Sequence, residues 1–102
     1  MLDRLTVDTF AAALGGTFTL DAGTAGTFEL ELTYASTHAP DAPAVGPDGV
    51  RSPFSIRFRG PSVPVLAQHT YELEHPDIGP LAIFVVPIGS DAAGTTYEAV
   101  FA

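Results

Sequence analysis

The sequence contains no cysteine, no tryptophan and no lysine. The absence of cysteine excludes a disulfide framework, a thiolate nucleophile and a zinc site built on cysteine. Four arginines stand against twelve acidic residues, so the formal net charge is −8. Because phosphate groups are bound by positive surfaces, this balance argues against nucleic acid and against an anionic membrane surface as partners.

Long apolar runs are also absent. No run is long enough to span a bilayer, and the N-terminus lacks the basic segment and apolar stretch of a secretory signal. The expected location is therefore the cytoplasm, with incorporation into an assembled particle as a further expectation. The length of 102 residues suits one domain, residues 1–102, and the 46% of apolar residues is enough to fill a small core.

Alternation of polar and apolar residues predicts about six short strands. The clearest pattern is that of residues 27–34, and the other segments are 17–20, 54–59, 70–75, 81–86 and 95–101. In the clearest strand, the residues expected to face the core are Phe28, Leu30, Leu32 and Tyr34. Short connections favour antiparallel neighbours.

Residues 6–14 are predicted to form a short helix, with Thr6 as the N-cap and Gly15 as a left-handed terminator. Residues 36–53 contain four prolines and two glycines, and we expect a mobile loop there. This loop is interpreted either as a tolerated insertion or as a functional segment.

Together these elements predict a mainly β domain. It consists of a short N-terminal helix and a roughly six-stranded antiparallel barrel or curled sheet, with a β-sandwich as the alternative. Barrel closure is favoured because it removes exposed strand edges.

The segment 81–86 is apolar on both faces. Its inner face carries Leu81, Ile83 and Val85, and its outer face carries Ala82, Phe84 and Val86. The outer face needs cover, either from the N-terminal helix or from another protein chain. We therefore expect Ala82, Phe84 and Val86 to belong to an interaction surface.

No catalytic, cofactor-binding or metal-binding set is predicted. His69 and His75 share one strand at a separation of about 20 Å, which is too far to hold one metal ion. His75 and Asp77 bracket the start of a Pro- and Gly-bearing turn, and both are candidates for an interaction at its tip.

The remaining charged residues fall at outward strand positions. The carboxylates are expected to be solvated, and the arginines are expected to form cross-strand ion pairs with them if the arginine strand lies beside either glutamate strand. These positions are Glu29, Glu31, Glu72, Glu74, Arg57 and Arg59.

Several short motifs are spread along the chain. They are Leu5-Thr-x-x-Thr-Phe10, Phe58-Arg-Gly-Pro61, Tyr71-x-Leu-x-His-Pro-x-x-Gly79, Phe84-x-Val-Pro-Ile-Gly89 and Tyr97-Glu-Ala-Val-Phe101. In this combination the chain resembles a family of small bacterial proteins of unknown function, associated with genes for phage-tail-like proteins with collar domains. The resemblance implies no activity and no catalytic residue. It implies an accessory or structural subunit.

The sequence therefore favours a non-enzymatic structural or protein-interaction module, such as an accessory subunit of a phage-tail-like or other multisubunit assembly. Its partner would be another protein or a second copy of the chain, and no cofactor is expected. One alternative is a barrel that binds a small apolar ligand under the loop at 36–53. Another is an enzyme that uses His75 and Asp77 or the loop histidine, His38.

Overall fold

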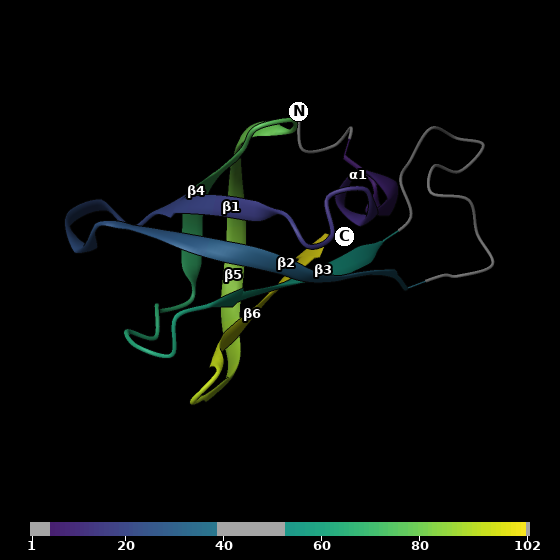
Figure 1. Ribbon diagram of the computed structural model, residues 1–102. Helices are drawn as coiled ribbons and strands as arrows, with labels where there is room; N and C mark the ends of the chain where they lie inside the picture. The colour runs from purple at the N-terminus through teal and green to yellow at the C-terminus, as the bar shows by residue number, and fades with distance from the viewer. Residues whose placement is uncertain (1–4, 39–52, 102) are drawn as a thin grey trace.

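The computed structural model describes residues 5–38 and 53–101. Its elements are α1 (Val7–Ala11), β1 (Thr17–Asp21), the 3-10 turn η2 (Gly23–Ala25), β2 (Thr27–Thr37), β3 (Phe54–Gly60), β4 (His69–His75), β5 (Gly79–Asp91) and β6 (Gly94–Phe101). The six strands form a closed antiparallel barrel in the order β1-β2-β3-β6-β5-β4. Figure 1 shows β1 and β2 crossing β4 and β5 steeply. The predicted barrel is confirmed, and the sandwich alternative is wrong.

The barrel closes through pairs of strands that are distant in sequence. β1 pairs with β4, where Leu20 lies opposite Leu73, and β3 pairs with β6, where Phe58 lies opposite Tyr97. The other neighbours follow one another along the chain. Closure therefore leaves each strand with a partner on both sides.

The barrel interior is filled by side chains from every strand. All are less than about a tenth exposed: Phe18, Leu20, Leu30, Leu32, Phe54, Ile56, Phe58, Leu73, Ile83, Val85, Tyr97, Ala99 and Phe101 from the strands, with Phe10 and Leu66 from outside them. The inward residues predicted for β3 and β6 are all buried, but Ser55 of β3, expected to point outward, is also buried.

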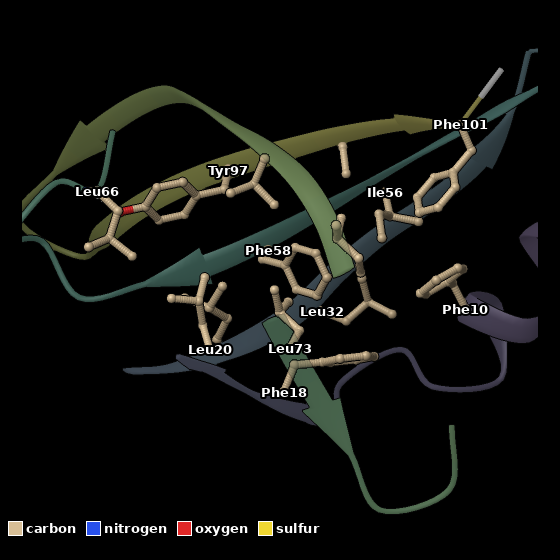
Figure 2. Packing of buried hydrophobic residues seen from close by; sticks show 14 of the residues in the cluster. Phe10, Phe18, Leu20, Leu32, Ile56, Phe58, Leu66, Leu73, Tyr97 and Phe101 are labelled. Atoms are coloured by element: carbon tan, nitrogen blue, oxygen red, sulfur yellow. Dashed lines mark hydrogen bonds between the residues drawn. The ribbon is translucent and has the colours of Figure 1, made fainter. Parts of the chain in front are cut away.

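Different segments close the two ends of the barrel. At one end α1 inserts Phe10, whose ring lies 5.5 Å from that of Phe101 and 5.8 Å from that of Phe54. At the other end the connection between β3 and β4 inserts Leu66, whose backbone N–H donates to the Tyr97 hydroxyl oxygen at 2.8 Å. Figure 2 shows Phe10 and Phe101 at one end of the cluster and Leu66 and Tyr97 at the other.

The prediction for β2 is correct up to Leu32 and wrong beyond it. The register with β3 shifts between Leu32 and Tyr34, which marks a β-bulge. The bulge turns Tyr34 outward, where it is 39% exposed, and Ala35 packs against the core instead. The strand also continues to Thr37, so the expected loop does not begin at residue 36. Most of that loop, residues 39–52, lies outside the described residues.

The prediction for β5 is too short. The strand was expected to end at residue 86, but β5 continues to Asp91 with an irregularity between Pro87 and Gly89. The chain then turns through two residues into β6, which begins at Gly94. The irregularity lets a residue without an amide donor lie inside a strand.

The helix is shorter than expected. α1 ends at Ala11, and turns lead to Gly15, which has the predicted left-handed φ of 82°. Leu14, within the predicted helix, follows its actual end and is 47% exposed. The chain is tied to the barrel here, since Gly15 N–H donates to the Leu32 carbonyl at 2.8 Å.

Candidate functional site

The outer face of β5 carries exposed apolar side chains. Ile83 and Val85 point into the core, and Phe84 between them is 53% exposed. Ala82 is also exposed, while Val86 is half-buried. α1 packs against β2 and β3 and not against this face. The idea that the helix covers the face is therefore wrong, and among the described residues no element lies over it.

The strand register places acidic residues beside this apolar face. On β4, Thr70 lies opposite Phe84 and Glu72 lies opposite Ala82. On the β6 side, Glu98 lies opposite Val86, where the β5–β6 ladder begins. Val100, further along β6, is 60% exposed. We call Ala82, Phe84, Val86 and Val100 the β5 apolar strip.

The outer surface of β1, β2 and β4 is rich in carboxylates. Thr19 lies between Glu29 on β2 and Glu74 on β4, and Asp21 lies beside Glu72. All four carboxylates and Glu31 are exposed. For the glutamates this was predicted, whereas Asp21 was expected in a turn. An acidic wall therefore adjoins the β5 apolar strip along β4.

The arginines of β3 lie beside β2, with Arg59 opposite Glu31. Within the described residues, the ion pair joins Arg57 Nε to Glu98 Oε2 at 3.2 Å, on the other neighbour of β3. Arg57 also lies over the Tyr34 ring at 4.6 Å from its centroid. Among the described residues, Arg57 therefore pairs with a glutamate of β6 that the sequence did not single out, and not with the predicted glutamates of β2 or β4.

His75 ends β4 and is buried, with 9% of its surface exposed. Its ring centroid lies 4.7 Å from that of Phe18. Its Nδ1 accepts hydrogen bonds from the backbone N–H groups of Asp77 at 3.1 Å and Ile78 at 3.3 Å. The structure thus brings His75 and Asp77 together through the Asp77 backbone, and the exposed carboxylate takes no part.

Two open hollows flank His75. One, of about 230 Å³, lies between the turns after α1 and the β4–β5 turn, and it is lined by Thr9, Ala12, Ala13, Leu14, Gly16, His75, Asp77 and Ile78. The other, of about 480 Å³, is lined by Thr17, Thr19, Glu74, His75, Pro76 and Gly79. These hollows were not foreseen, because they depend on where α1 meets a turn that is distant in sequence.

The candidate residues fall into two separate groups. Thr70 is the register partner of Phe84, and Gly79 is that of His75. Five strand residues therefore separate the two places, or about 16 Å. The β5 apolar strip and the His75 hollow are distinct sites.

The other two histidines lie apart from His75. His69 is exposed and meets the Tyr71 ring edge-on at 5.2 Å. His38 Nε2 lies 2.6 Å from the Ser55 hydroxyl. This contact was missed, although the β2–β3 register places both residues at the same end of the pair.

Ser55 and His38 lack a third group to orient the histidine, within the part of the chain that is described. In the same residues, no group of three or more His, Asp or Glu side chains could hold a metal ion. None of the helices found in residues 5–38 and 53–101 has the length and apolar character needed to cross a membrane.

The fold and surface define a small closed antiparallel barrel of six strands, capped at one end by a helix and bearing an apolar strip beside an acidic wall. The chain belongs to the family described as a domain of unknown function, DUF6916, whose model matches residues 5–101. Comparison with curated proteins and with solved structures gave no match.

Proposed function

We propose that this domain is a non-enzymatic protein-interaction module whose contact surface is the β5 apolar strip. The observation that supports the proposal is the 53% exposure of Phe84, which lies between the buried Ile83 and Val85 of the same strand. Aromatic side chains of this kind dominate the energy of protein interfaces.

The partner is a protein with an apolar ridge and basic side chains along one edge. Glu72 and Glu98 flank the strip, and the whole chain carries a net charge of −8. Two copies that met through this strip would bring these carboxylates together, and like charges across an interface are costly. Charge complementarity therefore favours a different protein over a second copy.

A subunit role in a multisubunit assembly follows from the same proposal. The resemblance to proteins encoded near phage-tail-like collar genes indicates where the partner is to be sought. The enzymatic alternative has less support, because His75 Nδ1 is engaged by two backbone amides. The alternative that the barrel binds a small ligand also has less support, because its interior is filled by side chains such as Phe18 and Phe58, whose ring centroids are 5.2 Å apart.

The test replaces Phe84 by serine and compares the proteins retained from extracts of the native host. Phe84→Ser should abolish retention of the partner and leave the melting temperature nearly unchanged, because the side chain is half in solvent. Val63→Ser is the matched control, since Val63 is 76% exposed on the β3–β4 connection, and it should retain the partner.

Two results would contradict the proposal. If the wild type and Phe84→Ser retained identical sets of proteins, the strip would not be an interface. If light scattering showed a concentration-dependent dimer that Phe84→Ser abolished, the partner would be a second copy of the chain and not a different protein.

A further inference from the structure

The backbone turn after His75 selects one tautomer of its neutral imidazole ring. Its Nδ1 accepts from two backbone N–H groups, those of Asp77 and Ile78. A neutral imidazole carries one proton, so an Nδ1 that accepts leaves the proton on Nε2. His75 therefore presents an N–H donor at the far edge of its ring.

This donor has no acceptor among the described residues. All fully buried side-chain nitrogen and oxygen atoms there have partners, so the unpaired Nε2 must reach open space. His75 as a whole is nonetheless nine-tenths buried and held against Phe18. A side chain held this firmly keeps its donor in a fixed direction.

Gly16 provides the room around this donor. A Cβ atom at Gly16 would lie 3.1 Å from His75 Nε2 and 2.9 Å from the Ala13 carbonyl oxygen. Gly16 and His75 both line the hollow of about 230 Å³. The Nε2 edge of the ring therefore faces the α1 side, where this hollow opens.

The rest of the hollow suits a small, mainly aliphatic molecule. Leu14, which is 47% exposed, forms part of its wall with Ala12 and Ala13. Asp77 is exposed at its rim and offers a carboxylate acceptor. A volume of about 230 Å³ exceeds the roughly 30 Å³ of one water molecule several times over.

These features select the chemistry of the ligand. His75 Nε2–H requires an acceptor, and Asp77 accepts from an N–H group. A ligand carboxylate would meet the Asp77 charge and the net charge of −8. An amide offers a carbonyl and an N–H with no charge, and a short aliphatic group would cover Leu14.

We infer that the hollow between the turns after α1 and the β4–β5 turn binds an amide carrying a short aliphatic group, with its carbonyl held by His75 Nε2–H. This site lies about 16 Å along the strands from Phe84, the exposed aromatic residue of the β5 apolar strip, and does not depend on that strip. The amide comes either from a free small molecule or from a peptide unit of a protein.

The test follows the imidazole nitrogens of the whole ¹⁵N-labelled chain by NMR as N-isobutylacetamide is added. A saturable shift of His75 Nε2 is expected, with a dissociation constant near ~1 mM, because a fragment of this size gains little binding energy. Isovalerate carries a negative charge that Asp77 and the net charge of −8 repel, and isobutylammonium has no acceptor for His75 Nε2–H, so each should bind at least about tenfold more weakly.

His75→Asn supplies an acceptor near the Nδ1 position, so it should fold. It removes Nε2, so the backbone amide signals of Asp77 and Ile78, which should shift saturably in the wild type, should no longer do so in this variant. His69→Asn and Phe84→Ser should bind as the wild type does, which separates this site from the proposed interface. If His75→Asn fails to fold, the comparison of the three compounds on the wild-type protein still tests the inference.

The inference is overturned by a linear, non-saturating response to N-isobutylacetamide, by equal binding of the three compounds, or by undiminished binding to folded His75→Asn. The blocked peptide N-acetylvalyl-glycinamide identifies the source. Binding about tenfold tighter than that of the small amide assigns the site to a protein chain, equal binding assigns it to a free molecule, and both support the amide chemistry.

Discussion

At the scale of single residues, Tyr97 has a role that its position in an alternating strand does not reveal. The ring is buried in the barrel, and the hydroxyl oxygen accepts from Leu66 N–H at 2.8 Å. The sequence identifies Tyr97 as inward-facing. It cannot identify the partner of the hydroxyl, because that partner lies in an irregular segment 31 residues away.

Tyr97→Phe should lower the free energy of unfolding by about 1–3 kcal/mol, since it leaves the buried Leu66 N–H without an acceptor. Urea unfolding followed by circular dichroism measures the change. Tyr71→Phe is the matched control, because the Tyr71 hydroxyl donates to the Ala67 carbonyl at an exposed position. A larger loss for Tyr71→Phe than for Tyr97→Phe would refute this account.

Gly16 is a second residue whose structural role could not be predicted from the sequence. In the sequence it is one of two adjacent glycines, and only Gly15 carries a turn signal. In the structure the space at Gly16 is limited by the nearby Ala13 carbonyl oxygen and by His75, which belongs to a strand much later in the chain. The contact with His75 leaves no local pattern in sequence.

At the scale of elements, strands with regular alternation were predictable and their irregularities were not. Phe54, Ile56 and Phe58 of β3 are all buried, as the pattern indicates. The bulge that turns Tyr34 outward depends on how β2 pairs with β3, and pairing is not encoded in one strand alone.

The ion pair between β3 and β6 should contribute little to stability. Arg57 and Glu98 are 42% and 28% exposed, and exposed pairs are typically worth about 0.2–1 kcal/mol. A double-mutant cycle with Arg57→Gln and Glu98→Gln should give a coupling energy in that range, decreasing in 1 M salt. Coupling well above it, or coupling insensitive to salt, would contradict the expectation.

At the scale of the whole molecule, the effect of charge on stability depends on where the carboxylates lie as well as on the net charge. The net charge of −8 was evident from composition, but the acidic wall arises because β1 lies between β2 and β4. That order places Glu29 and Glu74 on either side of Thr19. Neighbouring carboxylates repel one another, so this part of the surface is destabilised by its own charge.

Thr19→Lys should relieve that repulsion and raise the free energy of unfolding by about 0.5–1 kcal/mol at low ionic strength. Thermal unfolding at low and high salt measures the gain, which should shrink as salt screens the charges. Thr19→Gln has a side chain of similar reach without charge and should give no gain. A gain of the same size for glutamine would show that charge is not its cause.

The candidate sites were foreseen unequally. The double apolar character of β5 is visible in the sequence and indicates Phe84, because a packed inner face forces its neighbours outward. The hollow between α1 and His75 depends on two segments that are distant in sequence, the turns after α1 and the β4–β5 turn. Their meeting is a property of the closed barrel, so local sequence could not indicate it.

The way the barrel closes also has a consequence for how fast the chain reaches it. The β4–β5 and β5–β6 hairpins join neighbours in sequence, but β1 must find β4 and β3 must find β6 across about half the chain. Folding slows as contacts become less local, and barrels of this kind fold in roughly milliseconds to seconds. We expect the β4–β5–β6 meander to form early and the pairing of β1 with β4 to be a late, rate-determining event.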